Sequence, residues 1–572
     1  MEREYSYLSG ISAGRTSRYN LDQHLDGRIS GYDVQRYKTI LSGPENRQLY
    51  ARRVHGSENS SNASRKAAHQ LGQGLTMQPD VIIIGSGMGG ATLAAALAES
   101  GKQILILEKG DWLKDSPEAR DPAAIFGRNF YRTDEVWLDS AGKPFNPGNY
   151  YHPGGNSKFY GAVLLRYRAE DFGPLQHLEG TTPGWPISYD TMEPWYSRAE
   201  ELYEVRGALG HDPTEPHHSI PYPFPPVPDE PPVADLAARL RKQGLNVGPS
   251  PLGVDIDKWL EGGKTTWDAF PNTRGGKMDA ETCGLAKALK YPNVRLLRNA
   301  EVVKLHAEGR RITAVDYLVE RIRQTICAPV ICLCMGAVKS AAMLLTSASD
   351  DHPTGLANSS DQVGRNFMNH NISAILAFSP FRRNDSVYEK TIQFNDWYLQ
   401  GGPDNYPLGN VQMLGKVMGP ILAAETGLPG WLANYVAEHS MHLMTMSEDL
   451  PNPDSRVMVK DGQITLQWQR SNFRAHIALT DKLKNALRKA GWPIVISKTF
   501  EKKTPSHQCG TARMGNDPAT SVVNKNLSTH DFDNLYIIDA SVLPTSAAVN
   551  PSLTIAALAL RAGDHILTTD LT

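Results

Sequence analysis

Cysteine is scarce in this sequence: the chain has 572 residues and only five cysteines. No two of them form a Cys-x-x-Cys pair, so the spacing typical of metal ligands is absent and we expect no metal site. Their small, odd number and the apolar text beside three of them favour buried, reduced thiols. The five are Cys283, Cys327, Cys332, Cys334 and Cys509.

Long hydrophobic runs and a charge imbalance are also missing. No 18-residue apolar run occurs, so the sequence predicts no membrane-spanning helix. The first thirty residues are polar and lack the apolar core of a secretory signal, so we expect a cytoplasmic protein. A net charge of −2 gives no electrostatic reason to expect a nucleic-acid or anionic-membrane partner.

Glycine and proline, by contrast, are plentiful, with 49 and 38 copies. This composition fits a loop-rich α/β enzyme better than a helical bundle. The length predicts several domains, or one large enzyme with an inserted domain.

The stretch from Asp80 to Glu108 has the pattern of a dinucleotide-binding strand–helix–strand unit. A β-branched strand, an alanine-rich helix and a second buried strand follow one another. Gly85, Gly87 and Gly90 at the first junction allow a tight turn, backbone approach to a pyrophosphate and close helix packing. Glu108 ends the second strand, where an acid can hydrogen-bond ribose hydroxyls. The pattern does not distinguish NAD from FAD.

Apolar segments typical of buried strands occur again far along the chain, at residues 326–333 and 535–538. A last helix is predicted over 552–567. Between these parts, alternating segments such as 456–459 and 463–468 indicate an antiparallel sheet. The chain is therefore predicted to be α/β, with a discontinuous Rossmann-like domain interrupted by an inserted antiparallel-sheet domain. The strand near the C-terminus should pair with the sheet that begins at residue 81.

Residues 1–78 precede the first strand and lack sustained periodicity. We expect an arm or partly disordered extension, with one short helix over residues 33–41. Such an arm could wrap a neighbouring subunit, which makes a homo-oligomer one expectation.

Two polar residues near the C-terminus are candidates for chemistry. His507 begins a glycine-punctuated loop, and Asn550 with Pro551 begins the last predicted helix. Taken alone, each has a structural interpretation, because Asn-Pro is favourable helix-capping chemistry and His507 is one of 17 histidines.

Six motifs taken in order resemble the glucose–methanol–choline (GMC) oxidoreductases over roughly residues 78–570. They are residues 80–108, 154–157, 334–337, 361–370, 507–515 and 534–555. The pair His507 and Asn550 is similar to that of the pyranose oxidase, cholesterol oxidase and choline oxidase side of the family. Two-histidine members carry His at position 550.

The resemblance implies that the dinucleotide is FAD. Members with covalent FAD carry a histidine where this chain has Phe159, so we expect a noncovalent flavin. The residues assigned to FAD in this way are Gly85, Gly87, Gly90, Glu108, Gly155, Asn156, Ser157, Val302, Asp539, Ala540 and Pro551. FAD-binding segments are then expected at 79–190, 286–372 and 505–572, with linking or substrate segments at 191–285 and 373–504.

The resemblance also implies oxidation of an alcohol, with hydride transfer to flavin N5. An imidazole can take the hydroxyl proton at neutral pH, which makes His507 the candidate base. The amide of Asn550 can donate a hydrogen bond to the developing alkoxide. His370 belongs to one of the motifs and is expected to support structure near the flavin without a chemical role.

The expected substrate is a small polyhydroxylated molecule, such as a sugar, a glycoside or an aminoglycoside. Segment 448–457 resembles part of the substrate domain in sugar-oxidising members, and aromatic faces commonly pack on sugar rings. The aromatic candidates are Trp397, Tyr398, Trp431 and Trp468. A sterol or other alcohol oxidase or dehydrogenase, and a flavin-dependent lyase, stay open as alternatives. The electron acceptor is O2 or another molecule.

Overall fold

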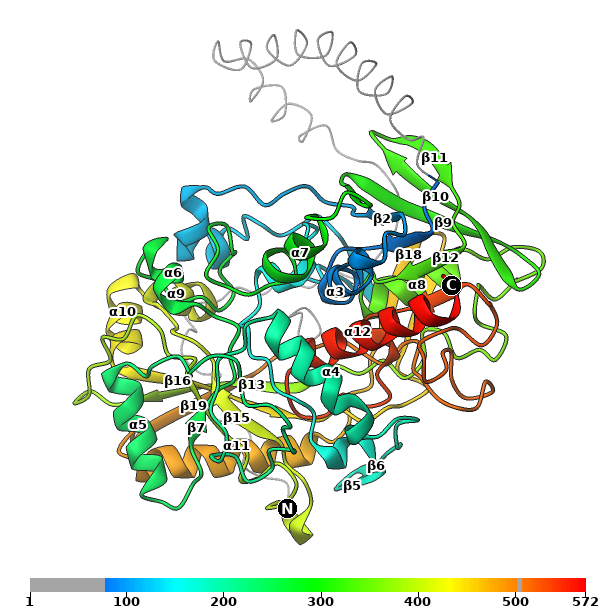
Figure 1. Ribbon diagram of the computed structural model, residues 1–572. Coiled ribbons are helices and arrows are strands. Elements are labelled where there is room, and N and C mark those ends of the chain that lie inside the picture. Colours follow the sequence, from blue (N-terminus) through cyan, green and yellow to red (C-terminus); the bar gives the residue numbers. More distant parts are fainter. Residues whose placement is uncertain (1–77, 502–506) are drawn as a thin grey trace, which may run out of the picture. The chain divides into compact units, whose positions relative to one another are not determined.

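The structure is a computed structural model that describes residues 78–501 and 507–572. The predicted arm and its short helix lie outside the described residues. The secondary-structure elements are drawn in Figure 1.

A five-stranded, all-parallel sheet organises the nucleotide-binding half of the molecule. Its order is β20 (Leu535–Ile537), β12 (Val330–Leu333), β1 (Val81–Ile84), β2 (Ile104–Leu107) and β8 (Val294–Leu297). The two strands β1 and β2 are buried along their whole length, as expected for parallel strands covered on both faces. Leu535 pairs with Ile331 in parallel register, so the predicted closure of the sheet by the C-terminal strand is confirmed.

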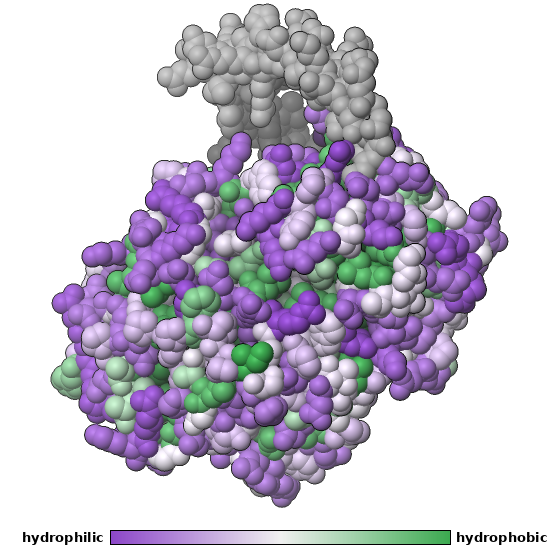
Figure 2. Space-filling view, in the orientation of Figure 1, coloured by the Kyte–Doolittle hydropathy of each residue, from purple (hydrophilic) through white to green (hydrophobic). Residues whose placement is uncertain are grey.

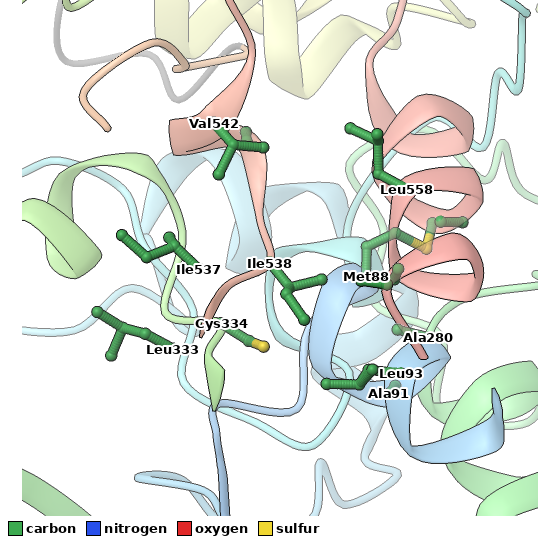
Figure 3. Packing of buried hydrophobic residues seen from close by; sticks show 14 of the residues in the cluster. Met88, Ala91, Leu93, Ala280, Leu333, Cys334, Ile537, Ile538, Val542 and Leu558 are labelled. Carbon is green, nitrogen blue, oxygen red and sulfur yellow. The ribbon is translucent and has the colours of Figure 1, made fainter. Parts of the chain in front are cut away.

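Helix α3 (Met88–Leu97) packs on strands β1 and β2 of this sheet. Helix α12 (Ser552–Thr569) packs on α3, and α4 (Tyr189–Leu202) packs on α12. Helix α8 (Ala337–Thr346) follows β12 in the chain and contacts the turn after β20. Figure 1 shows α12 running beside α3 and α4, and Figure 3 shows side chains from α3, β12, the end of β20 and α12 gathered in one apolar cluster. Segments from both ends of the described chain therefore share one core.

One predicted strand is divided in two. The run 326–333 was expected to be continuous, but β11 (Ile322–Ile326) ends at the first residue of the run and β12 begins only at Val330. Pro329 separates them, and a proline cannot donate to a sheet ladder. Strand β11 forms a separate antiparallel sheet with β10 (Arg311–Val319) and β9 (Ala300–Glu308).

The predicted antiparallel sheet is present and has six strands. Its order is β19 (Ile494–Thr499), β13 (Asn371–Phe378), β16 (Ser440–Ser447), β15 (Asn410–Met413), β14 (Ile392–Phe394) and β7 (Gly248–Pro249). Apolar side chains of this sheet form a second hydrophobic core with helix α11 (Phe473–Lys489) and helix α5 (Pro231–Arg241). The fold is thus α/β, with a Rossmann-like parallel sheet and an antiparallel sheet.

The alternating segments at 456–468 form a hairpin outside the six-stranded sheet. They are β17 (Arg456–Lys460) and β18 (Gln463–Gln467), which join β3 (Trp137–Asp139) and β4 (Pro144–Phe145). The remaining elements are β5 (Leu175–His177), β6 (Gly180–Thr182), α6 (Ile256–Glu261), α7 (Ala286–Ala288), α9 (Gly419–Thr426) and α10 (Gly430–Glu438).

On the face of the molecule shown in Figure 2, hydrophilic residues predominate and hydrophobic ones lie among them. Within the described part of the chain, none of the helices has the length and apolar character needed to cross a membrane.

Candidate functional site

The glycine loop between β1 and α3 is shaped by backbone contacts. A Cβ at Gly90 would lie 2.0 Å from the carbonyl oxygen of Gly85, and one at Gly89 only 1.9 Å from that of Ile538. A Cβ at Gly87, the residue before α3, would meet nothing within 4 Å. Two glycines are therefore required for packing, while Gly87 leaves bare backbone beside a helix N-terminus, the surroundings that a pyrophosphate needs.

Glu108 lies at the carboxyl end of β2, directly beside the glycine loop. Its carboxylate accepts hydrogen bonds from the Ser86 hydroxyl at 2.7 Å, the Ser86 N–H at 3.1 Å and the Gly110 N–H at 2.9 Å. Burial raises the pKa of Glu108 despite these bonds. The side chain thus braces the loop that would hold the adenosine half of FAD.

The second predicted flavin loop touches the first. A Cβ at Gly155, whose φ is +56°, would lie 3.3 Å from the Cα of Gly87. Ser157 donates to the carbonyl oxygen of Gly154 at 2.6 Å and accepts from the N–H of Ala280 at 3.0 Å. The structure therefore brings together two motifs that are separated by about 70 residues in the sequence.

Asn156 and Phe159 complete this loop. The Asn156 side chain accepts a hydrogen bond from the N–H of Tyr150 at 2.9 Å. Phe159 is buried, and its ring stacks on that of Tyr150 with a centroid distance of 3.7 Å. An apolar, packed side chain occupies the position where covalent members carry histidine, so this residue has no group that could bond to a flavin.

The remaining predicted FAD residues lie on three different elements. Val302 is buried in β9, Asp539 and Ala540 lie just beyond the end of β20, and Pro551 precedes α12. The Asp539 carboxylate is fully engaged by the protein, accepting from Gly336 N–H, Ser340 Oγ, Ser541 N–H and Ser541 Oγ. Any contact of Asp539 with a cofactor would thus use its backbone.

The side chains of His507 and Asn550, the candidate pair that the family resemblance implies, lie in contact. The Nδ2 of Asn550 lies 3.3 Å from the Nε2 of His507. His507 adopts a left-handed backbone conformation with φ +57°, which is uncommon outside glycine and often found at functional sites. Burial lowers the pKa of His507 well below its usual value, and nearby His370 and Lys390 add to this effect. The imidazole is therefore neutral at pH 7.

His370 determines which nitrogen of His507 carries the proton. Its Nε2 lies 2.9 Å and 2.7 Å from the carbonyl oxygens of Ser546 and Ala547, so this nitrogen must carry a hydrogen and donate. Burial lowers the pKa of His370, so its Nδ1 is an acceptor. That Nδ1 lies 2.8 Å from the Nδ1 of His507, which therefore donates. The Nε2 of His507 is left with a lone pair that faces Asn550.

The side chain of Asn550 does not cap helix α12. The expected N-cap role is wrong, because helix α12 begins at Ser552 with Pro551 as its N-cap, and the helix start has no side-chain cap. The amide of Asn550 instead contacts His507 on one side and accepts a hydrogen bond from the Nε2 of Gln412 at 3.0 Å on the other.

Two residues of this site were missed or undervalued in the sequence. His370 was expected to have only a supporting role, and Gln412 was not singled out. The signal available for Gln412 was its place in β15, where Asn410 and Gln412 alternate with apolar residues in a strand that is buried along its whole length. Buried polar residues with a period of two indicate a functional or hydrogen-bonded strand face.

The aromatic residues expected to face a sugar do other things. Trp397 packs on Phe394 at a centroid distance of 5.4 Å, and Trp431 is 74% exposed. Tyr398 is buried and its hydroxyl donates to Asp171 at 2.8 Å. Trp468 donates to Asp449 at 2.8 Å. The aromatic argument for a sugar substrate therefore has no support in the structure.

Two family models match the chain. The model described as GMC oxidoreductase covers residues 452–559, which include His507 and Asn550. The model described as FAD dependent oxidoreductase covers residues 80–354, which include both predicted flavin loops.

Curated relatives align over most of their length. The chain is 28% identical to 2-methyl-1,2-propanediol dehydrogenase of Mycolicibacterium austroafricanum, over 86% of this chain and 95% of the relative. It is 28% identical to paromamine 6'-oxidase of Streptomyces fradiae, over 85% of this chain and 91% of the relative. It is 26% identical to the fructose dehydrogenase large subunit of Gluconobacter japonicus, over 86% and 98%.

Among solved structures, the fold is similar to that of pyridoxine 4-oxidase from Mesorbium loti. The TM-score is 0.61 at 20% identity, with 86% of this chain and 99% of that chain covered. At this identity the likeness concerns the fold.

Proposed function

Since the chain belongs to the GMC oxidoreductase family and is an FAD-dependent oxidoreductase acting on alcohol groups, we propose that it oxidises one hydroxyl of a small polyhydroxylated substrate to a carbonyl. The substrate class is that of sugars, glycosides and aminoglycosides.

The observation that carries the proposal is the convergence of His370, His507 and Asn550. The Nε2 lone pair of His507 is positioned to accept the hydroxyl proton, because its other nitrogen donates to His370. The Nδ2 of Asn550, 3.3 Å from that lone pair, can donate to the oxygen that becomes negative. When bound, FAD supplies the acceptor for the hydride that leaves the same carbon.

Polar surroundings support a polyhydroxylated substrate over a sterol. Gln412 contacts Asn550 directly, and Asn410 hydrogen-bonds to Gln412 at 2.7 Å, so the β15 face next to the pair consists of amides. Relatives named for a diol, an aminoglycoside and fructose point to the same class. A sterol oxidase would need an apolar wall here.

The flavin is proposed to be noncovalent. Phe159 is packed against Tyr150 and has no nucleophilic atom. FAD should therefore be released when the protein is denatured with acid, and the supernatant should then contain the flavin. Flavin that stays with the precipitated protein would contradict this part of the proposal.

The function is tested by anaerobic mixing of the FAD-loaded enzyme with a panel of sugars, glycosides, aminoglycosides and simple diols. Bleaching of the flavin absorbance by members of the panel is expected. Peroxide release on admission of air separates an oxidase from a dehydrogenase. A panel in which no alcohol bleaches the flavin, while a substrate is cleaved without net oxidation, would favour the lyase alternative.

A further inference from the structure

A chain of buried amides leads from an ion pair to the catalytic asparagine. Arg168 pairs with Asp212, and Asn395, Asn410 and Gln412 follow in hydrogen-bonded order. The three amide side chains are at most 1% exposed. Since buried polar groups are nearly always paired, the order of donors and acceptors along this chain can be worked out.

The ion pair sets the direction of the whole chain. Burial alone would raise the pKa of Asp212, but Arg168 and the hydrogen bonds from Asn395 and Thr214 hold it below its usual range. The carboxylate therefore only accepts hydrogen bonds. The side chain of Asn395 must present its Nδ2 to Asp212, at 2.5 Å, and its Oδ1 to the next amide.

Each following amide is oriented by the one before it. The Nδ2 of Asn410 donates to the Oδ1 of Asn395 at 2.8 Å, and the Nε2 of Gln412 donates to the Oδ1 of Asn410 at 2.7 Å. The same Nε2 donates to the Oδ1 of Asn550 at 3.0 Å, which leaves the Nδ2 of Asn550 facing His507. This orientation of Asn550 agrees with the lone pair that His370 leaves on His507, although the two hydrogen-bond chains start from different groups.

One atom in this chain lacks a partner. The Oε1 of Gln412 is buried and has no hydrogen-bond partner among the described residues. Its orientation is fixed, because exchanging Oε1 and Nε2 would place acceptor against acceptor at both Asn410 and Asn550. A buried acceptor without a partner is costly, so it calls for a donor.

The reacting hydroxyl cannot supply this donor. Its single proton goes to the Nε2 of His507, and its oxygen accepts from Asn550. A second donor group on the substrate is needed, and it must lie near the reacting carbon because Gln412 and His507 both contact the side chain of Asn550.

We propose that Gln412 is a specificity-determining residue whose Oε1 accepts a hydrogen bond from a hydroxyl or ammonium group adjacent to the alcohol that is oxidised. The preferred substrates are therefore vicinal diols and vicinal amino alcohols, including sugars and amino sugars. This inference rests on the proposed function, since it assigns a role at the same site.

Four probes with one carbon skeleton test it on the FAD-loaded enzyme. They are 1,2-propanediol, 2-amino-1-propanol, 2-methoxy-1-propanol and 1-propanol. Dissociation constants come from perturbation of the flavin absorbance, and reduction rates come from anaerobic stopped-flow measurements. We write kred for the rate constant of flavin reduction at saturating alcohol. The diol and the amino alcohol, which carry a donor at carbon 2, should have kred/Kd values at least about 10-fold higher than those of the other two probes. This is the size expected when a buried acceptor is left unpaired.

Variants of Gln412 separate recognition from folding, because the preference is a ratio within one protein. In Gln412→Leu the ratio of diol to 1-propanol should fall to about 1 to 2. Gln412→Glu keeps an acceptor but loses the Nε2–H that donates to Asn410 and Asn550, so it should slow all four probes. Within that slower reaction it should keep the preference for the two donor probes and shift it toward the amino alcohol. Gln393→Leu is the matched control: Gln393 is the cross-strand partner of Gln412 and its Oε1 is already paired with Asn410. That variant should slow all four probes and keep the ratio.

The outcomes distinguish the two proposals. An unchanged ratio in Gln412→Leu, or equal dissociation constants for all four probes in the wild type, would overturn the role of Gln412, and water would then be the partner of its Oε1. Donor-selective binding without any flavin reduction would support the role of Gln412 and contradict alcohol oxidation.

Discussion

The nucleotide side of the site, at the glycine loop, depends on backbone, whereas the substrate side, at His507 and Asn550, depends on side chains. Around Gly85, Gly87 and Gly90 the important feature is bare backbone, within one continuous stretch of 29 residues. Around His507 and Asn550 the important features are side-chain atoms contributed by segments far apart in the sequence and oriented by hydrogen bonds. The first side is determined by steric fit, and the second by the direction of each donor and acceptor.

The largest expected effect comes from adding a side chain to the glycine loop on the nucleotide side. Gly90→Ala would press a Cβ to 2.0 Å from a backbone oxygen, so we expect little or no FAD-loaded protein and a lower Tm. Gly87→Ala meets no protein atom within 4 Å and should keep the Tm of the FAD-free protein. Its Kd for FAD should nevertheless rise at least about 10-fold if a pyrophosphate lies there.

Thermal scans with and without FAD, together with FAD titrations, compare the two variants. Wild-type FAD affinity in Gly87→Ala would show that the bare backbone at this position does not hold the phosphates.

The next effect concerns the hydrogen bond that orients His507 on the substrate side. His370→Leu removes the acceptor for the Nδ1–H of His507, and the loss of this bond should slow flavin reduction by about 10- to 100-fold. His370→Asn keeps an acceptor near the same place and should recover part of the rate. Stopped-flow reduction with a saturating alcohol measures both. Equal rates in the Leu and Asn variants would mean that His370 acts only through packing.

A smaller effect is expected in the pH dependence of reduction. Because burial lowers the pKa of His507 well below 6.5, the imidazole stays neutral as the solution becomes more acidic. The acid limb of kred/Kd for a non-ionising alcohol should therefore lie below pH 6.5. A limb centred near pH 6.5 would indicate a solvent-exposed base.

The smallest effect is on stability, at a group near the substrate side. Burial, and then the charge of Glu448, raise the pKa of Asp171 to about 7. A carboxyl whose folded-state pKa is raised stabilises the fold below its unfolded pKa, and that stability is lost as the pH rises from about 4 to about 7. Asp171→Asn should flatten this part of the stability curve. Denaturant unfolding at a series of pH values measures it, and an unchanged slope would contradict the raised pKa.

The two sides also differ in how far the sequence predicts them. The glycine loop, its strands and Glu108 are local, so spacing and residue type suffice to place them. The membership of β20 in the parallel sheet follows from the buried-strand patterns near residue 81 and near the C-terminus. The choice of β12 as its neighbour does not follow from them. No local pattern places His507 beside Asn550, which became a candidate pair only through resemblance to a family.

Gln412 and the tautomer-setting role of His370 could not be predicted in this way. Their roles depend on which atom of each side chain faces the next, and that depends on distances of 2.7 to 3.3 Å across separate strands and loops. The N-cap expectation for Asn550 was wrong for the same reason, because its amide is held by partners distant in the sequence.

The most direct test of the account compares wild type and His507→Ala, both loaded with FAD, on anaerobic mixing with an alcohol that reduces the wild type. His507 is not among the predicted FAD residues, so the variant should keep its bound flavin. Its rate of reduction should fall at least about 100-fold, the low end of the contribution of a general base. Reduction of His507→Ala at the wild-type rate would contradict the central claim that this imidazole takes the hydroxyl proton.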